Sequence, residues 1–227
     1  MPEYKPKTPT VVDISKVDGS PHPRKIGFST DKSRYKTSKQ TMGDPLINYE
    51  GKSNPYIDYQ SIDLLLSLQH PRSEGYDEMC FYVMGQVKEI LFKGLHFELF
   101  NAREQIKLDE INNAITILER SIEYVKFIAD AWNILSTIKP EGFNQFRDYL
   151  GTASGQLSFM YRHVEFILGN KSEKMASAHK NVPHVWPEIK KNLETPSLYD
   201  EVIFYLNRKG LSISEAVLDR NWKKTYK

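Results

Sequence analysis

The sequence predicts an all-α protein, a helical bundle built from long antiparallel helices. Apolar residues recur at three- and four-residue steps over two long segments, as the buried face of a helix requires. No segment shows the sustained two-residue alternation of a β-strand. Apolar residues make up 40% of the 227 residues and charged residues 26%, which is typical of a globular protein with one sizeable core.

The first 53 residues differ in composition from the rest of the chain. They are rich in Lys, Pro, Ser, Thr and Gly, and they show neither the helix period nor the strand period. Such a segment cannot bury enough apolar surface to offset the entropy lost on ordering. We therefore expect residues 1–53 to form a mobile N-terminal arm, or one that orders only against another subunit. Residues 54–227 are expected to form the helical domain.

Two long helices are expected in this domain. A lead-in helix near residues 56–68 ends at His70-Pro71, because the residue before a proline disfavours helical dihedral angles. Ser73 is expected to cap the first long helix, over about residues 74–103. The second is expected over about residues 109–138, with an apolar face formed by Ile111, Ile115, Leu118, Ile122, Val125, Ala129, Trp132 and Leu135. Shorter helices are expected at 141–150, from the turn at 151–155 to Leu168, and near 172–180, 185–192, 197–209 and 213–219.

Charge and cysteine content exclude several classes of partner. The formal net charge of +2 is too near neutral to indicate nucleic acid or an anionic membrane as a partner. The single cysteine, Cys80, excludes an internal disulfide framework and a cysteine-rich zinc site. No apolar run approaches the roughly 20 residues that span a bilayer, and the N-terminus lacks the apolar core of a secretory signal. We expect a cytoplasmic protein.

Gly85 is the first candidate site residue. A glycine inside an apolar-periodic helix costs about 1 kcal/mol relative to alanine, so its presence needs a reason. The structural interpretation is tight packing of another helix, and Gly94 repeats the pattern on the same helix. The functional interpretation is the close approach of a flat ligand, and Phe81, one turn earlier, would line the same face.

Arg162 is the second candidate, because it lies among apolar residues and a buried charge needs a partner. Its guanidinium can pair with Glu165, one turn further on, or with the carboxylate of a bound amino acid. Around the preceding turn, the hydroxyls of Ser154 and Ser158 can cap a helix or bind an anion. Both interpretations remain open for these residues.

The tyrosines and histidines are less specific. Tyr56 and Tyr59 are one turn apart, so both can face one pocket, although an ordinary core role explains them equally well. None of the six histidines pairs at the spacing of a metal motif such as HExxH, and we expect each to be structural or exposed. The sequence assigns no metal ligand.

Two segments carry a family resemblance, YDEMCFYVMGQVKEILFK (residues 76–93) and FRDYLGTASGQLSFMYRHVE (residues 146–165). The GNK at 169–171, PSLYDE at 196–201 and the RNW around Trp222 extend it. Together they resemble the tryptophan 2,3-dioxygenase family, all-helical haem enzymes that open the indole ring of L-tryptophan. The resemblance covers roughly residues 54–226, with many matched positions in fixed order.

The resemblance implies haem b as cofactor, with dioxygen and L-tryptophan or a related indole or aromatic compound as substrates. Arg162 would bind the substrate carboxylate, and Phe81 would wall the pocket for the aromatic ring. Tyr56 and Tyr59 would contribute to a pocket, in the family often one on a neighbouring subunit. The haem would be bordered by three residues: Ser154, Gly155 and Tyr161. The family also implies a homo-oligomer, a dimer or a tetramer.

The chain departs from the family pattern at several positions. Gly85 stands where the family places its distal, catalytic histidine, and Tyr76 replaces another histidine nearby. Gln156-Leu157 replaces a Phe-Gln pair of the family. The haem-ligating proximal histidine is not found, so the helical domain is expected to be incomplete at its C-terminus. In one version of this hypothesis a second polypeptide supplies the missing part; in another, the haem has been abandoned.

Two functions therefore follow as expectations. The first is an oxidoreductase, a haem-dependent dioxygenase or monooxygenase that inserts oxygen from dioxygen into an aromatic amino acid. The alternative is a non-catalytic helical protein that binds an aromatic amino acid or a partner subunit and has lost the haem.

Overall fold

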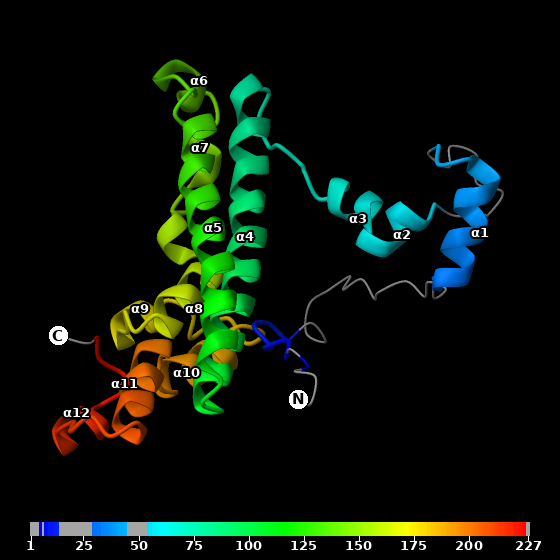
Figure 1. Ribbon diagram of the computed structural model, residues 1–227. Coiled ribbons are helices and arrows are strands. Elements are labelled where there is room, and N and C mark those ends of the chain that lie inside the picture. Colours follow the sequence, from blue (N-terminus) through cyan, green and yellow to red (C-terminus); the bar gives the residue numbers. More distant parts are fainter. Residues whose placement is uncertain (1–4, 6, 14–28, 45–53, 226–227) are drawn as a thin grey trace. The chain divides into compact units, whose positions relative to one another are not determined.

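The structure is a computed structural model of the chain and describes residues 5, 7–13, 29–44 and 54–225. Within these residues every regular element is a helix, which confirms the predicted all-α class (Figure 1). None of the described helices is long and apolar enough to cross a membrane.

The chain divides into two compact units, which are Met1–Asp18 with Pro71–Lys227, and Gly19–His70. The boundary expected after residue 53 thus lies inside the smaller unit. That residues 1–53 form a mobile arm stays a prediction.

The smaller unit contains α1 (Asp31–Thr41), α2 (Pro55–Gln60) and α3 (Ile62–Leu66). We did not expect α1, because its sequence lacks a helix period. It buries no residue, and it begins with reciprocal hydrogen bonds in which Ser33 N donates to Thr30 Oγ1 (3.1 Å) and Thr30 N donates to Ser33 Oγ (2.8 Å). A capping box of this kind defines a helix start locally, without help from packing.

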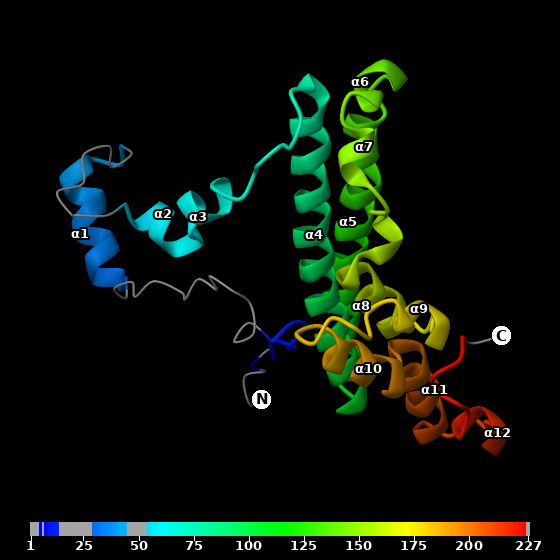
Figure 2. The ribbon, with the colours of Figure 1, turned by 180° about the vertical axis from the view of Figure 1, so that it is seen from behind.

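Two long helices, α4 (Tyr76–Lys107) and α5 (Ile111–Leu135), form the centre of the larger unit. They run side by side in opposite directions and are joined by a short turn (Figures 1 and 2). Both were predicted, with ends shifted by a few residues. Asp109 allows the tight connection by adopting a left-handed backbone (φ 60°), and the side chains of Arg208 and Lys209 bind its carboxylate.

The start of α4 differs from the prediction. Gly75, not Ser73, is the N-cap residue, and it offers no side chain to cap the helix. Instead Glu78, in the first turn, accepts hydrogen bonds from the backbone N–H groups of Arg72 (2.8 Å) and Ser73 (2.7 Å). These bonds hold the pKa of the Glu78 carboxyl below its usual range. A carboxylate in this position also suits the positive end of the helix dipole.

The apolar face predicted for α5 is wrong in part. Ile115, Ile122, Val125 and Trp132 are each about half exposed. The face that packs against α4 instead contains small buried residues, namely Ala114, Ser121 and Ala131. Small side chains let two helices approach closely, and α5 is apolar on more than one side, so periodicity alone did not identify the packed side.

The remaining helices are short. In chain order they are α6 (Pro140–Asn144), α7 (Arg147–Leu150), the 3-10 turn η2 (Gly155–Leu157), α8 (Phe159–Ile167), α9 (Glu173–Ser177), α10 (Trp186–Glu194), α11 (Leu198–Arg208) and α12 (Glu215–Leu218). All of them lie within ranges predicted to be helical, or directly beside them.

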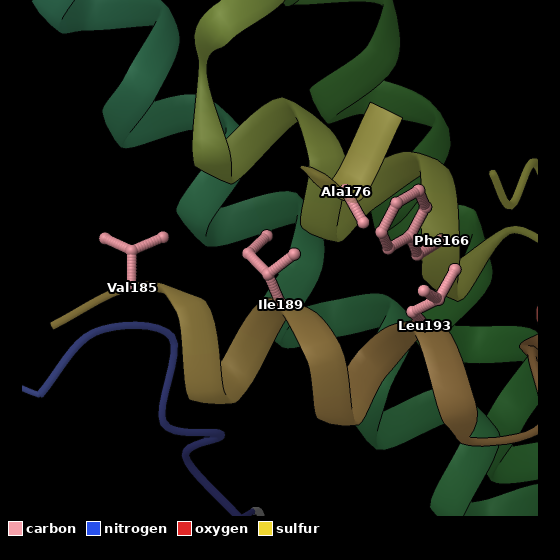
Figure 3. Packing of buried hydrophobic residues seen from close by; sticks show 5 residues of the cluster. All are labelled: Phe166, Ala176, Val185, Ile189 and Leu193. Atoms are coloured by element: carbon pink, nitrogen blue, oxygen red, sulfur yellow. The ribbon is translucent and has the colours of Figure 1, made fainter. Parts of the chain in front are cut away.

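Helix α8 lies between two clusters of buried apolar residues. On one side Val164 and Ile167 pack against Leu95 and Leu99 of α4. On the other side Phe166 packs with residues of α9 and α10, which Figure 3 shows as the cluster Phe166, Ala176, Val185, Ile189 and Leu193. Fully burying one such side chain contributes about 1.5–3 kcal/mol. Apolar packing therefore fixes α8 on both of its faces.

The segment 7–13 is part of the larger unit and contacts its helices. Lys7 N donates to Asn101 Oδ1 (2.9 Å), and Asn101 Nδ2 donates back to Lys7 O (3.0 Å). Val11 is buried, and Asp13 N donates to His184 O (2.9 Å). This part of the chain is thus connected to α4 and to the loop before α10.

A buried lysine connects α8 to the C-terminal helices. Lys171 follows α8 and is 1% exposed, with its ammonium donating to the carbonyls of Asn192 (3.1 Å), Leu193 (3.1 Å) and Thr195. These carbonyls lie at the C-terminal end of α10, where the carbonyl groups have no hydrogen-bond donor within the helix. Burial lowers the pKa of Lys171 to about 8. The ammonium therefore caps α10 from inside the protein.

Asp200 lies beside this lysine and completes the same arrangement. It accepts hydrogen bonds from Ser197 N (2.7 Å) and from Arg220 Nε (2.6 Å). Burial alone would raise the pKa of Asp200, but the bonds from Arg220 and Ser197 outweigh it and leave the pKa lowered. The family-like motifs GNK, PSLYDE and RNW thus converge on one buried charge network, which has a structural role.

The network predicts a large loss of stability when the lysine is removed. Lys171→Met should lower the free energy of unfolding by about 2–3 kcal/mol, because three buried carbonyls lose a charged donor. Urea unfolding monitored by circular dichroism measures the change. Lys174→Met, at an exposed position three residues later, is the matched control and should change little. Equal effects of the two substitutions would contradict the capping role.

Candidate functional site

The candidate site begins on one face of α4. Phe81, Gly85 and Glu89 are spaced by four residues, so they share that face. The Phe81 ring packs near Phe146 (centroids 5.3 Å apart) and Phe143 (6.0 Å). Phe81 is therefore held against the connection between α5 and α8, and it presents an aromatic ring next to Gly85.

Gly85 itself faces open space. A methyl group built on its Cα would meet no heavy atom within 4 Å. At Gly94 the same methyl group would lie only 2.6 Å from Cε1 of Tyr124 on α5. The interpretation as tight helix packing is thus wrong for Gly85 and correct for Gly94. On this face of α4 the space beside Gly85 is bordered by Phe81 and Glu89.

Glu89 lies one turn after Gly85 on the same face of α4. Burial raises the pKa of its carboxyl, while the hydroxyl of Ser158 and the ammonium of Lys88 lower it to a lesser extent. The Ser158 hydroxyl also caps α8 by accepting a hydrogen bond from Tyr161 N (3.0 Å). The α4 face is thereby connected to the start of α8. Sequence reasoning did not single out Glu89 as a site residue, although its four-residue spacing from Gly85 was a usable signal.

The turn before α8 is exposed over residues 151–157. Ser154 accepts a hydrogen bond from Gln156 N (3.2 Å) and so caps η2. Capping is one of the two roles that the sequence left open for this hydroxyl. Whether Ser154 and Gly155 border a cofactor stays a prediction.

Tyr161 belongs to the contact between α4 and α8. Its ring centroid lies 5.4 Å from that of Phe92, and the guanidinium carbon of Arg162 lies 4.9 Å from the same tyrosine ring. The ring is half-buried. Its predicted role beside a cofactor would have to be combined with these contacts to Phe92 and Arg162.

Arg162 is buried, with only 2% of its side chain exposed, and it has partners within the chain. Nη1 lies 2.6 Å from Glu165 Oε2, so the ion pair that the sequence suggested is present. Nη2 lies 3.5 Å from Gln156 Oε1, at the limit of a hydrogen bond. The buried Nε has no hydrogen-bond acceptor. The guanidinium thus keeps unused hydrogen-bonding capacity.

Tyr56 and Tyr59 lie on α2 in the smaller unit, and both are exposed, by 64% and 74%. The expected helical spacing is confirmed, and their contribution to a pocket stays a prediction. An open hollow of about 410 Å³ runs along α1, lined mainly by serine and threonine hydroxyls with Arg34. No residue predicted to form the site lines it, and we do not connect it with the candidate site.

Sequence reasoning missed a cluster of buried histidines. The rings of His96 on α4 and His163 on α8 are 5.1 Å apart, and His179 is buried near them. His163 Nδ1 lies 3.1 Å from Asn192 Nδ2. Burial, with the neighbouring charges, lowers the pKa of His96 to about 3 and that of His163 to about 4. Both are structural, as expected, and uncharged near neutral pH.

Among the described residues no three His, Cys, Asp or Glu side chains are grouped so that they could hold a metal ion. Cys80 is free and half-buried. His70 is exposed and His184 half-buried, which agrees with the expectation that the histidines are structural or exposed. In the described residues, no histidine was found next to Gly85.

Taken together, the fold and the site define an all-helical protein with an open space at a glycine of a long helix, an aromatic side chain one turn away, and a buried arginine on a second helix that packs against the first. Comparisons with known proteins identify its family. The sequence profile described as tryptophan 2,3-dioxygenase matches residues 42–224. The chain therefore belongs to the tryptophan 2,3-dioxygenase family.

Three curated relatives illustrate the similarity, all carrying the name tryptophan 2,3-dioxygenase. The protein numbered 1 from Ralstonia nicotianae is 39% identical over 76% of this chain and 59% of its own length. Relatives from Burkholderia multivorans (38%) and Paraburkholderia phytofirmans (39%) match over 76% and 75% of this chain and 56% of their own lengths. The chain thus spans less than two thirds of the length of these relatives.

The residues present fit one side of a flat cofactor such as haem. The space at Gly85 admits a ring close to the α4 backbone, and Phe81 supplies an apolar neighbour. The imidazoles of His96 and His163 are buried against each other, and no side-chain atom lies within 4 Å of a methyl group built at Gly85.

The two glycines of α4 predict opposite responses to alanine. Gly85→Ala should raise the free energy of unfolding by up to about 1 kcal/mol, because alanine favours the helix and the new methyl group meets nothing. Gly94→Ala should lower it by about 1–3 kcal/mol, because the methyl group overlaps the Tyr124 ring. Chemical denaturation of both variants tests the pair. Destabilisation by Gly85→Ala would show that the space beside it is filled.

The buried imidazoles predict acid sensitivity. Their pKa values are depressed in the folded protein, so between about pH 6.5 and pH 4 the unfolded chain binds protons that the folded chain does not. The free energy of unfolding should therefore fall as the pH drops through this window, by up to about 1.4 kcal/mol per pH unit for each imidazole. Urea unfolding at pH 7.5 and pH 5 measures the difference.

A variant isolates this effect from other titrating groups. His163→Gln should reduce the difference between the two pH values, whereas His70→Gln, at an exposed position, should leave it unchanged. An unchanged pH difference in His163→Gln would mean that His163 is not the source.

Proposed function

We propose that this chain forms the part of a haem-dependent oxygenase that binds an aromatic amino acid, L-tryptophan or a related indole or aromatic compound. The observation that carries the proposal is the open space at Gly85 beside Phe81, in a chain of the tryptophan 2,3-dioxygenase family. Membership of the tryptophan 2,3-dioxygenase family, whose members are haem enzymes, supports haem b as the cofactor. The relatives' names support dioxygen as the co-substrate.

Each site residue has a part in this proposal. When bound, haem supplies the ferrous iron that activates dioxygen. Gly85 lets the ring system approach the α4 backbone, and Phe81 packs against the aromatic ring of the amino acid. Arg162 binds the carboxylate. Further contacts with the cofactor edge come from Ser154, Gly155 and Tyr161, and Tyr56 and Tyr59 contribute to a pocket on a neighbouring subunit.

The absence of an imidazole at position 85 affects what the site can do. No side chain at Gly85 can accept a hydrogen bond from the indole N–H, so the ligand must be oriented by its carboxylate and by ring packing. Both monooxygenation and dioxygenation are compatible with such a site. Glu89, whose carboxyl has its pKa raised by burial, is a titratable group one turn away.

The partners in this proposal are further polypeptide chains. The iron would be held by a residue outside the described part of the chain or by one on a second polypeptide. Assembly into a homo-oligomer, a dimer or a tetramer, is in keeping with the family. A cytoplasmic location fits a protein with one free cysteine.

Titration of the purified chain with hemin, followed by absorption spectroscopy, tests the proposal. We expect a Soret band that saturates at one haem per chain. Gly85→His should shift that band, because an imidazole would reach the ring. Ile90→His is the matched control, since it adds an imidazole to the same helix roughly 140° away from Gly85. Its spectrum should equal that of the unaltered chain.

Two results would count against the haem. One is the absence of specific hemin uptake, which would favour the alternative function, a non-catalytic protein that binds an aromatic amino acid or a partner subunit. The other is a Gly85→His spectrum identical to the control, which would move the haem away from α4.

A further inference from the structure

The guanidinium of Arg162 has two chemically distinct sides. Nη1 is taken by Glu165, whose Oε2 lies 2.6 Å away. Nε and Nη2 form the other edge, a pair of parallel N–H groups that matches the two oxygens of a carboxylate. At this edge Nε is buried and has no acceptor, and Nη2 has a 3.5 Å contact with the amide oxygen of Gln156. The edge is therefore aligned for a carboxylate but is only weakly occupied.

Glu165 holds the guanidinium without competing for this edge. Its Oε1 accepts a hydrogen bond from Asn170 Nδ2 (3.0 Å), so the carboxylate is fixed from its other side. Its Oε2 faces Nη1 but lacks the alignment of a hydrogen bond, as expected for a pair three residues apart on one helix. Such a pair restricts the rotation of the guanidinium and leaves the Nε and Nη2 edge available.

Gln156 lies in the exposed turn 151–157, unlike the buried arginine that it contacts. A neutral amide oxygen at 3.5 Å is a weak acceptor for a guanidinium, and a charged carboxylate is a much stronger one. An arriving carboxylate can therefore displace Gln156 by moving an exposed turn, with no change in α8.

We infer that Gln156 occupies the ligand edge of Arg162 as a neutral substitute for the α-carboxylate, and that Glu165 is the positioning residue that aims this edge. The inference rests on the proposed function for the identity of the ligand, an α-amino acid. It assigns to Gln156 the control of carboxylate affinity: binding requires its amide to leave Arg162.

Two substitutions at the same position should have opposite effects. Gln156→Ala removes the occupant and should tighten binding of L-tryptophan several-fold. Gln156→Glu places a tethered carboxylate on the Arg162 edge and should weaken binding by about tenfold or more, which corresponds to about 1.4 kcal/mol. Tryptamine has the same ring and amine but no carboxylate, so its affinity should be unaffected by either change. Isothermal titration calorimetry of the full chain with both ligands gives these ratios.

A charge control separates a specific contact from a general field. Leu157→Glu adds the same charge to the same exposed turn, at a residue that is 50% exposed. It should leave the ratio of L-tryptophan to tryptamine affinity unchanged. If Gln156→Ala and Gln156→Glu shifted this ratio in the same direction, or if Leu157→Glu reproduced the effect of Gln156→Glu, the inference would be wrong.

Thermal denaturation without ligand tests the same geometry independently of the proposed function. Gln156→Glu should be more heat-stable than Gln156→Ala, because its carboxylate satisfies the buried Nε, and Arg162→Ala should abolish this difference. If the difference is seen but the unaltered chain binds no L-tryptophan, the edge is as described and the proposed function fails. If no such difference is seen, the inference is overturned whatever the ligand.

Discussion

The buried ammonium of Lys171 is the interaction on which the rest of the larger unit depends. It lies directly after α8 and donates to three carbonyls at the end of α10, so it joins two helices that share only a modest apolar cluster. Asp200 and Arg220 lie beside it and form a second buried pair. Removing one member of a buried charge network leaves the others uncompensated, which is why such networks stabilise one arrangement rather than many.

Helix α8 transmits this constraint to the candidate site. Its C-terminal end is fixed by Lys171, its two faces by apolar clusters, and its first turn by Ser158, which also contacts Glu89 of α4. The helix that carries Arg162 is therefore fixed by these contacts, and only the preceding turn 151–157 is exposed. An arginine held by a rigid helix next to an exposed turn is a suitable arrangement for the carboxylate binding proposed above.

The sequence was sufficient for the fold class and for the long helices, because α4 and α5 have strong apolar periodicity. It was not sufficient for the packed side of α5, where small residues such as Ala114 and Ser121 decide which face approaches α4. Nor did it distinguish Gly85 from Gly94, since both glycines interrupt the same pattern and only the position of Tyr124 separates them. Helix α1 was missed because its start depends on the local bonds of Thr30 and Ser33. The charge network was visible in the sequence only as the motifs GNK, PSLYDE and RNW, which do not tell which of their side chains pair with one another.

The polar groups around the site mostly have hydrogen-bond partners within the chain. This limits the binding free energy that a ligand can gain from them. The hydroxyls of Ser154 and Ser158 cap helices, and Glu89 contacts Ser158. What remains is the apolar space beside Gly85 and one edge of Arg162. Burying an aromatic ring contributes about 1.5–3 kcal/mol, and a charged hydrogen bond about as much. Because association itself costs several kcal/mol, these contacts alone give weak binding. Tight and oriented binding of an amino acid therefore requires further surface beyond these two contacts.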